Sequence, residues 1–357
     1  MSNVRLYFKN EKFQNVGVVQ QGAAGLNFSS LEWTSVFHKQ DSFAMQCGVS
    51  DSRDVEFMLD KSTVYVVRND TCQTAYINKK EFDGQKLTLE GIGVEGLLAK
   101  RFTLEKDYLP TGANAGVNKV GAVMCDIIND NSPYVWLRAD RAKNMTGPSI
   151  ATYTELTGNV YKYVKMLAEA YDVGFKCIYD EKTDMVDFIT YAVVPYSVDI
   201  PGRVYRLSDE LDNVKELTYE HDVSKYYNYV RVVGEDLTGV VDQSGGRERY
   251  EYSFKSRSRR KSLTTAEYTS ILKGEGVQEL AKRRAIEVFE VQPKDGQYVE
   301  LGWEAVSIGK NINVATLSFC TEVNEIWESS YKREYTFGYR VDSKDDLVIR
   351  LQGELYS

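Results

Sequence analysis

Residues 31–48 read LEWTSVFHKQDSFAMQCG. Two strand-like segments, 31–37 and 42–48, flank the polar residues His38, Lys39, Gln40 and Asp41. Two such segments joined by a four-residue polar loop are typical of a β-hairpin. This hairpin predicts that the chain begins as β structure.

The segments around this hairpin extend the β pattern over the first hundred residues. We expect strands at 4–9, 63–68, 74–82 and 86–90. Asp83-Gly84 lies between the last two strands, and an Asp-Gly pair favours a tight hairpin turn. A short helix at 94–100 is expected to close this module.

Length and composition agree with a folded, strand-rich chain of several modules. The 357 residues exceed what one small core usually organises, so we expect two to four modules. Hydrophobic residues make up 43% and charged residues 27%, and only six prolines occur, which argues against disorder. The 25 tyrosines and 14 phenylalanines suit pleated, half-buried surfaces and therefore favour strands.

The middle of the chain, residues 104–200, predicts an α+β module. Apolar residues recur at helical spacing over 118–130 and again over about 159–171. Thr157 is the expected cap of the second helix, and Gly174 follows its end. Two strands, 175–179 and 185–193, should come next.

The last third returns to strands with a helical interruption. Residues 227–234 alternate as a strand, and Thr264 with Glu267 predicts a capping box. After Gly274 and Gly276 a second helical stripe runs through Val277, Leu280, Ala281, Ala285 and Val288, and Pro293 is expected to end it. Strands then resume, most clearly at 331–337.

Composition also excludes several classes of function. The net charge is −8, and no region is basic enough for a nucleic-acid reader. The five cysteines form no metal-binding pair and are expected to be buried thiols, and two histidines leave few groups for proton transfer. No stretch reaches the roughly 20 apolar residues of a membrane span, and the first residues lack a signal peptide. We therefore expect a soluble product without integral membrane segment.

Several motifs with catalytic or cofactor interpretations are better explained structurally. The sequence GIGVEG at 91–96 matches a dinucleotide fingerprint, but its helix is short and no crossover precedes it, so a tight strand-to-helix turn is favoured. Isolated acid pairs and histidines fit surface positions, turns and strand ends better than acid–base chemistry. These are Asp126 with Asp130, Asp180 with Asp184, His38 and His221. We assign no catalytic, cofactor-binding or metal-binding residue, and we expect no enzyme.

One basic cluster remains as a candidate contact site. Five cations occur within seven residues at 255–261. They are Lys255, Arg257, Arg259, Arg260 and Lys261. A contact with an anion or a partner is compatible with this charge, but a solvated, mobile hairpin tip is the favoured interpretation because no aromatic residues interleave the cluster.

Several segments together resemble the siphophage tail-associated proteins, which are phage baseplate hub proteins. In that family a tryptophan strand precedes a Gly- or Ser-Phe strand, and a later strand has the pattern Tyr-x-Asn-x-Val-x-Val-x-Gly. The matching segments here are 29–33, 42–46, 64–68, 76–82, 87–91, 96–101 and 224–234. The sequence departs from the family at Lys100, where arginine is frequent, and over 243–290, whose length has no match.

The resemblance implies a fold shared with the hub of contractile-phage baseplates. It would be predominantly β, with two tube-like β-barrel domains, an α+β domain between them and a helical insertion in the second barrel. The corresponding divisions are 1–103 for the first barrel, 104–200 for the α+β domain, 201–242 with 291–357 for the second barrel, and 243–290 for the insertion.

The resemblance also implies a function by assembly. Three chains would present six barrels, so that a homotrimeric ring joins the sixfold tail tube to the tip and lines the DNA ejection channel. The implied partners are a distal tail protein or tail-tube ring, the tape measure protein, a tail fibre or tip protein, and genomic DNA in passage. The expected location is the virion tail tip or baseplate, after synthesis in the host cytoplasm. A tail-associated cell-wall-degrading enzyme and a host-surface binding module are the alternatives.

Overall fold

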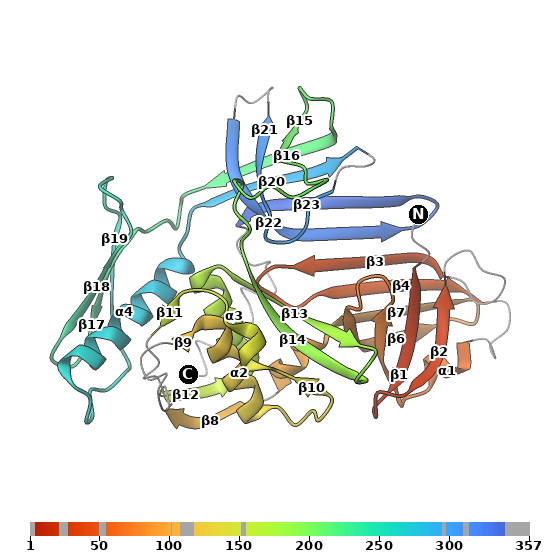
Figure 1. Cartoon of the computed structure of the whole chain (residues 1–357), viewed down its shortest axis with the longest axis horizontal. Coiled ribbons are helices and arrows are strands. Elements are labelled where there is room, and N and C mark those ends of the chain that lie inside the picture. Colours follow the sequence, from red (N-terminus) through yellow and green to blue (C-terminus); the bar gives the residue numbers. More distant parts are fainter. Residues whose placement is uncertain are drawn as a thin grey trace.

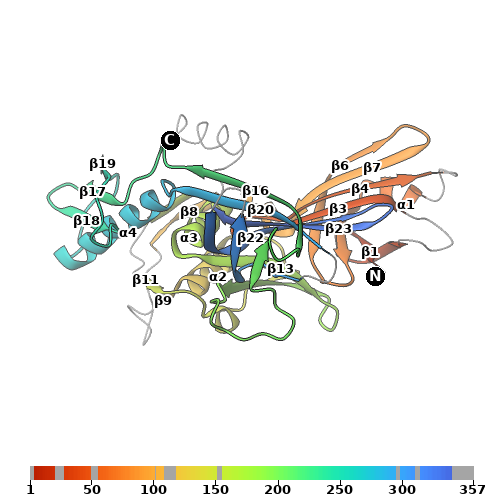
Figure 2. The ribbon, with the colours of Figure 1, turned by 90° about the horizontal axis from the view of Figure 1, so that it is seen from above.

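The computed structural model describes residues 4–20, 28–49, 55–100, 102–107, 118–150, 155–294, 298–309 and 314–339. Figure 1 shows strands from both ends of the chain side by side at the top and right, with helices below them. A separate unit of three strands and one helix projects at the left. Figure 2 confirms that this unit and the strands near the N terminus lie at opposite ends of the long axis.

The main element is one 13-stranded sheet that joins the first and last parts of the sequence. Eleven strands pair in one continuous, antiparallel path. In order, they are β16 (Val214–Asp222), β20 (Ile286–Pro293), β23 (Tyr331–Tyr339), β22 (Val314–Trp327), β3 (Phe28–Val36), β4 (Ser42–Gly48), β7 (Lys86–Gly93), β6 (Thr74–Phe82), β5 (Thr63–Arg68), β1 (Arg5–Asn10) and β2 (Asn15–Gln20). Off this path, β21 (Glu304–Gly309) pairs with β22 and with β15 (Arg206–Ser208).

Local sequence signals account for the hairpins of this sheet. The predicted hairpin at 31–48 is confirmed as the pair β3 and β4. Gly84 has a φ of +96°, which only glycine adopts readily, and it turns β6 back onto β7 as the Asp-Gly pair predicts. The predicted strands at 4–9, 63–68 and 331–337 are also confirmed.

The sheet encloses an apolar core at each of its two ends. In the first part, Leu6 of β1 and Val66 of β5 join one cluster with Trp33 and Met45 of the opposite wall, and the short helix α1 (Glu56–Leu59) adds Met58. In the second part, strands β15 and β21 fold over, so that Leu207 packs in one cluster with residues of β16, β20, β22 and β23. Each part is therefore a two-walled, strand-rich body.

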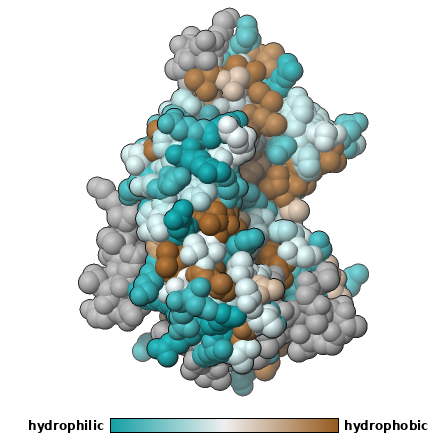
Figure 3. All heavy atoms as spheres, turned by 90° about the vertical axis from the view of Figure 1, so that its left-hand side faces the viewer, coloured by the Kyte–Doolittle hydropathy of each residue, from teal (hydrophilic) through white to brown (hydrophobic). Residues whose placement is uncertain are grey.

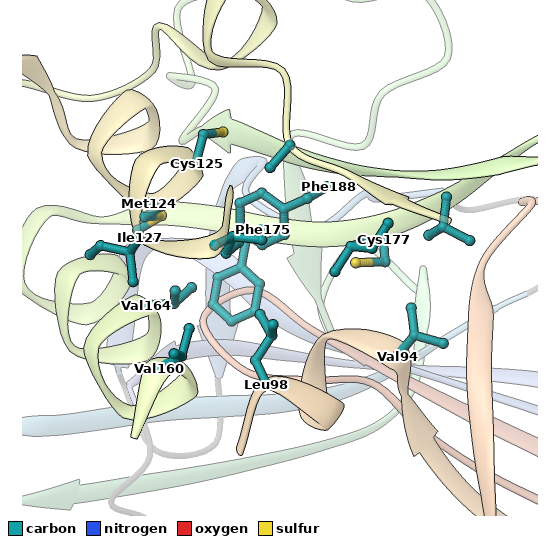
Figure 4. Close-up of a cluster of buried hydrophobic side chains, with 14 of the residues drawn as sticks. Val94, Leu98, Met124, Cys125, Ile127, Val160, Val164, Phe175, Cys177 and Phe188 are labelled. Atoms are coloured by element: carbon teal, nitrogen blue, oxygen red, sulfur yellow. The ribbon is translucent and has the colours of Figure 1, made fainter. Parts of the chain in front are cut away.

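The α+β unit between them contains the predicted helices. They are α2 (Val120–Asn131) and α3 (Val160–Tyr171), which pack with β13 (Val173–Asp180), β14 (Met185–Ala192) and the 3₁₀ helix η2 (Val94–Lys100). Figure 4 shows Val160 and Val164 of α3 beside Phe175 of β13, with Leu98 of η2 below the ring. The smaller elements are β8 (Phe102–Asp107), β9 (Asn118–Lys119), β10 (Leu137–Arg138), η4 (Arg141–Asn144), β11 (Ser149–Ile150) and β12 (Glu155–Asn159).

The cap predicted for α3 was wrong by two residues. Asn159, not Thr157, is the N-cap, and its side chain accepts a hydrogen bond from the backbone N–H of Lys162. The helix ends before Gly174 as expected, but Asp172 takes the left-handed conformation at its C-cap, with a φ of 52°. Either Asx or Ser/Thr side chains can cap a helix, so composition alone did not decide the position.

The projecting unit consists of β17 (Tyr229–Val233), β18 (Thr238–Asp242), β19 (Glu251–Lys255) and α4 (Thr265–Ala281). The predicted capping box of Thr264 and Glu267 is confirmed. Gly276 lets the helix approach the sheet, because a Cβ atom there would lie 2.8 Å from a methyl carbon of Val241.

The second helical stripe predicted here is confirmed for Val277, Leu280 and Ala281 and was wrong for Ala285 and Val288. The helix continues through Gly274 and Gly276 but ends at Ala281, and residues 286–293 form β20 instead. Pairing with β16 on one side and β23 on the other satisfies the backbone of this segment, so tertiary context overrides the helical spacing of Ala285 and Val288.

The predicted fold class is confirmed in its coarser form: the chain is predominantly β, with a large antiparallel sheet and an α+β unit. Within the described ranges the sheet does not close into a barrel. Strands β17 and β18 lie in a sheet with β19, apart from the large sheet, although the expected insertion began only at residue 243. The division into four domains stays a prediction.

Candidate functional site

The large sheet is held together at its centre by the pairing of β3 with β22. Trp33 lies opposite Glu325 and Leu31 lies opposite Trp327 in this antiparallel pair. Strands almost three hundred residues apart in the sequence therefore become neighbours. This junction makes one surface from the two ends of the chain.

An ionic group, which we call the Arg68 cluster, lies at this junction, and its members Arg68 and Glu325 are buried. It consists of Arg68, Asp70, Glu325 and Arg333. Nη1 of Arg68 lies 2.6 Å from Oε2 of Glu325, and Nη2 of Arg333 lies 2.5 Å from Oε1. Burial alone would raise the pKa of Glu325, but the charges of Arg68 and Arg333 lower it overall. The guanidinium of Arg68 also lies 4.6 Å from the ring centre of Trp327.

A second buried group, which we call the Asp41 cluster, connects the first strand-rich part to the α+β unit. It consists of Asp41, Glu95, Trp33, Ser35 and Gln73. Oδ2 of Asp41 accepts hydrogen bonds from Nε2 of Gln73 at 2.6 Å, from Oγ of Ser35 at 3.3 Å and from Nε1 of Trp33 at 3.3 Å. Oε1 of Glu95 accepts one from the backbone N–H of Asp41 at 2.9 Å.

Burial dominates the chemistry of this second group. It raises the pKa of Asp41 to about 6, and burial together with the nearby Asp41 carboxyl raises the pKa of Glu95 to about 8. Burial and Glu95 also raise the pKa of the Cys177 thiol in β13. No local sequence pattern marks Asp41 and Glu95 as a buried pair of carboxyls, because one lies in a loop and the other in a 3₁₀ helix.

One face of the large sheet carries many polar side chains, although Val36, Ile92 and Ile326 also lie on it. The register places Ile326, Glu32, Ala44, Glu90 and Lys79 side by side on β22, β3, β4, β7 and β6. The residues between them along each strand, such as Trp33 and Leu89, point into the cores. One row of side chains thus crosses the junction without a break.

Neighbouring rows continue the polar face to the far edge of the sheet. Glu334, Asn324, Thr34 and Ser42 form one row, and Thr218, Glu290, Thr336 and Glu322 form another. Glutamates outnumber lysines on this face. We call it the acidic face; its glutamates are Glu32, Glu81, Glu90, Glu216, Glu220, Glu290, Glu322 and Glu334, and its lysines are Lys79, Lys86 and Lys332.

Hydrogen bonds within the acidic face position several of these groups. Nδ2 of Asn324 donates to Oε1 of Glu32 at 3.0 Å, across the junction, and Oγ1 of Thr218 donates to Oε2 of Glu290 at 3.0 Å. A shallow depression of about 330 Å³ lies between Glu32 and Glu90, where Ala44 and Gly91 are small. The face therefore presents carboxylates without a deep binding pocket.

The basic cluster predicted at 255–261 lies elsewhere, at the end of β19 and in the link to α4. It is not a hairpin tip, because β19 runs parallel to β17 and leads into the helix. Arg260 forms an ion pair with Asp236 and donates a hydrogen bond to Oγ1 of Thr265 at 2.8 Å. Lys255, Arg257, Arg259 and Lys261 are exposed. Their role in binding an anion or a partner stays a prediction.

The glycine motif at 91–96 has no space for a phosphate. A Cβ atom on Gly93 would lie 2.0 Å from Oε1 of Glu95, so a carboxylate occupies the approach that a pyrophosphate needs. The motif forms the end of β7 and the start of η2. The favoured interpretation, a tight strand-to-helix turn, is confirmed.

Of the other weighed acids, Asp126, Asp180 and Asp184 have separate ion-pair partners. Asp126 pairs with Arg141, Asp180 pairs with Arg138, and Asp184 pairs with Lys9. His38 is buried in the loop after β3, and burial lowers its pKa to about 3, whereas His221 lies in β16. Four cysteines are buried and Cys72 is half-buried. Among the described residues, no three potential metal ligands gather.

Comparison with solved structures finds this arrangement in phage tail proteins. A tail protein from Neisseria meningitidis MC58 superimposes with a TM-score of 0.57 and 14% identity, covering 94% of this chain and 96% of that one. A prophage tail protein, gp18, from Listeria monocytogenes EGD-e gives 0.57 with 9% identity over 100% of both chains. This chain has the fold of phage tail proteins. The resemblance to phage tail and hub-like proteins is thereby confirmed, and the expected fold is confirmed in its coarser, predominantly β form.

A third tail protein has the same fold. The 43 kDa tail protein of prophage MuSo2 from Shewanella oneidensis gives a TM-score of 0.55 with 10% identity, covering 94% of this chain and 98% of that one. No protein-family model and no curated protein matches the sequence. In the described part of this tail-protein fold, no helix has the length and apolar character to cross a bilayer.

Proposed function

We propose that the chain is a structural hub protein of the tail tip or baseplate of a phage or phage-like particle. In this proposal three copies form a ring that joins the tail tube to the tip, with two curled, barrel-like domains from each copy. The tail-protein fold supports the role, and the single sheet built from both ends of the chain supports the two-domain ring. Its location would be the virion tail.

The acidic face is the observation that carries the more specific proposal, that the ring lines the channel for DNA. In each strand-rich part the apolar side chains pack into that part's own core, and the two parts share one polar face. Carboxylates on a channel wall repel phosphates, so that a duplex passes without binding. Glu32, Glu90 and Glu334 would face the passing DNA.

The proposed partners follow from this position. One end of the ring would meet a distal tail protein or the tail-tube ring, and the other a fibre or tip protein, while the tape measure protein and the genome pass through the centre. We propose that the chain works by assembly and breaks no bond itself. Zymography on cell walls should therefore show no clearing, and clearing would favour the alternative of a tail-associated enzyme.

A charge-reversal experiment tests the channel proposal. The triple variant Glu32→Lys, Glu90→Lys, Glu334→Lys should convert the ring from one that does not retain linear duplex DNA into one that binds it, with affinity falling steeply as salt increases. The matched control is Glu56→Lys, Glu248→Lys, Glu251→Lys, which changes three exposed acids outside the large sheet. Equal DNA binding by both triple variants would contradict a special role for the acidic face.

A further inference from the structure

Two strand edges on the acidic face have no neighbour in the described chain. Strand β6 pairs with β7 along its length, but on its other side it pairs with β5 only from Thr74 to Tyr76. Residues 77–82 of β6 therefore have one open side. Strand β16 pairs with β20 alone, so its outer side is open from Val214 to Asp222. Open edges present unpaired backbone groups that can pair with another chain.

Both lysines on the open part of β6 are held by contacts within their own chain. Nζ of Lys79 lies 3.1 Å from Glu81 and 3.3 Å from Glu90 on the same face. Nζ of Lys80 donates to the backbone oxygens of Asp60 and Thr63, at 2.7 and 2.6 Å. Edge lysines usually discourage pairing by projecting into solvent, and these two are held by their own chain.

Among the described strands, β2 and the three-residue strand β15 also have an unpaired side, and β2 lies in a different wall. Strands β5 and β1, which lead to β2, pack their apolar residues against the core from the side opposite β3 and β4. A neighbour added at β2 would extend that second wall. A neighbour added at β6 would extend the acidic face itself.

We propose that a second copy of this chain pairs its β16 edge with residues 77–82 of β6, which continues the acidic face from one protomer to the next. This inference rests on the proposed ring. On the polar side, the open part of β6 carries one cation, Lys79, and one acid, Glu81, and a neighbouring β16 would bring Glu216, Glu220 and Asp222 beside Lys79. The contact is heterologous, which is the type that closes rings.

Symmetry also fixes the direction of the pairing. The eight strands from β16 to β6 alternate in direction, so β6 runs opposite to β16 within one protomer. Rotation about a ring axis preserves the direction of every strand relative to that axis. The β6 of one copy and the β16 of the next therefore meet antiparallel, and the alternation continues around the ring.

Cysteine cross-linking of the full-length protein tests the contact. In a Cys72→Ser background, Lys79→Cys is combined in turn with Glu216→Cys, Thr218→Cys or Glu220→Cys, because a disulfide forms only where Cβ atoms lie about 4 Å apart. Oxidation should give covalent dimers and trimers for at least one pair. The matched controls combine Val18→Cys of β2 with the same three β16 positions and should stay monomeric on denaturing gels.

The outcomes separate this contact from the proposed function. If wild type sediments as a trimer but no Lys79 pair cross-links, the contact is refuted and the ring stands. Cross-linking of only the Val18 pairs would assign closure to β2 and refute the contact as well. A wild-type chain that stays monomeric at every concentration would overturn both the contact and the ring.

Discussion

The Arg68 cluster and the Asp41 cluster each contain buried charged groups and each connect separate strands, but only the first balances carboxylates with cations. In the Arg68 cluster, the Glu325 carboxylate is paired with two arginines. In the Asp41 cluster, two carboxyl groups are buried together. The two clusters share Trp33, whose indole N–H donates to Asp41 and whose ring lies 5.8 Å from the guanidinium of Arg68. The contributions of the two clusters to the free energy of unfolding should therefore change in opposite directions with pH.

The pKa shifts determine how the stability of the fold depends on pH. The lowered pKa of Glu325 contributes stability that is present above the unfolded value of about 4.3 and is lost as the pH falls through the folded pKa. The raised pKa values of Asp41 and Glu95, about 6 and about 8, mean that the folded state holds protons that the unfolded state has released. Their contribution is present at low pH and is lost as the pH rises toward 8.

The largest effect should come from breaking the Arg68 cluster. Glu325→Gln leaves Arg68, which is 1% exposed, with Asp70 as its remaining carboxylate partner and removes the charge that Arg333 faces, so it should lower the free energy of unfolding by about 3 kcal/mol. Urea unfolding at pH 7 measures this. The double variant Arg68→Met, Glu325→Leu is the control. Its loss of unfolding free energy should be smaller than that of the single variant, because it leaves neither of these two charges buried without the other. Equal losses would contradict the importance of charge compensation.

A smaller, pH-dependent effect should follow from Glu95→Gln. The amide keeps the acceptor for the N–H of Asp41 but cannot ionise, so the decline of the free energy of unfolding between pH 5 and pH 8 should become shallower, by on the order of 1–3 kcal/mol over this range. Glu325→Gln should leave that part of the profile unchanged. An unaltered slope in Glu95→Gln would show that this carboxyl is not the group that holds the proton.

The smallest effect should come from Ser35→Ala. This variant removes one of three side-chain donors to Asp41 and should cost about 1 kcal/mol in urea unfolding. Because a charged Asp41 needs its donors most, the loss should be larger at pH 8 than at pH 5. A loss that does not change with pH would separate Ser35 from the titration of the cluster.

The sequence predicted what is local in this structure and missed what depends on long-range contacts. The β3–β4 hairpin, the Asp-Gly turn and the capping box at Thr264 depend on neighbouring residues, and each is confirmed. The pairing of β3 with β22 joins segments nearly three hundred residues apart, and no local pattern specifies it. Strand β20 was misread because its partners, not its spacing, decide its conformation.

For the candidate site, a role could be predicted from the sequence but the residues could not. The family resemblance implied a role in lining a channel, but the residues of the acidic face could be named only once the register of β22, β3, β4 and β7 was known. The basic cluster at 255–261 was visible in the sequence because its residues are consecutive. Residues that act together across strands leave no such local signal.

Imaging of the purified assembly by electron microscopy tests the central claim most directly. We predict a threefold ring around a central passage, with the row of Glu32, Glu90 and Ile326 facing inward and the projecting β17–β19 and α4 unit outside the wall. A particle without a passage, or a ring whose acidic face points outward, would contradict the account.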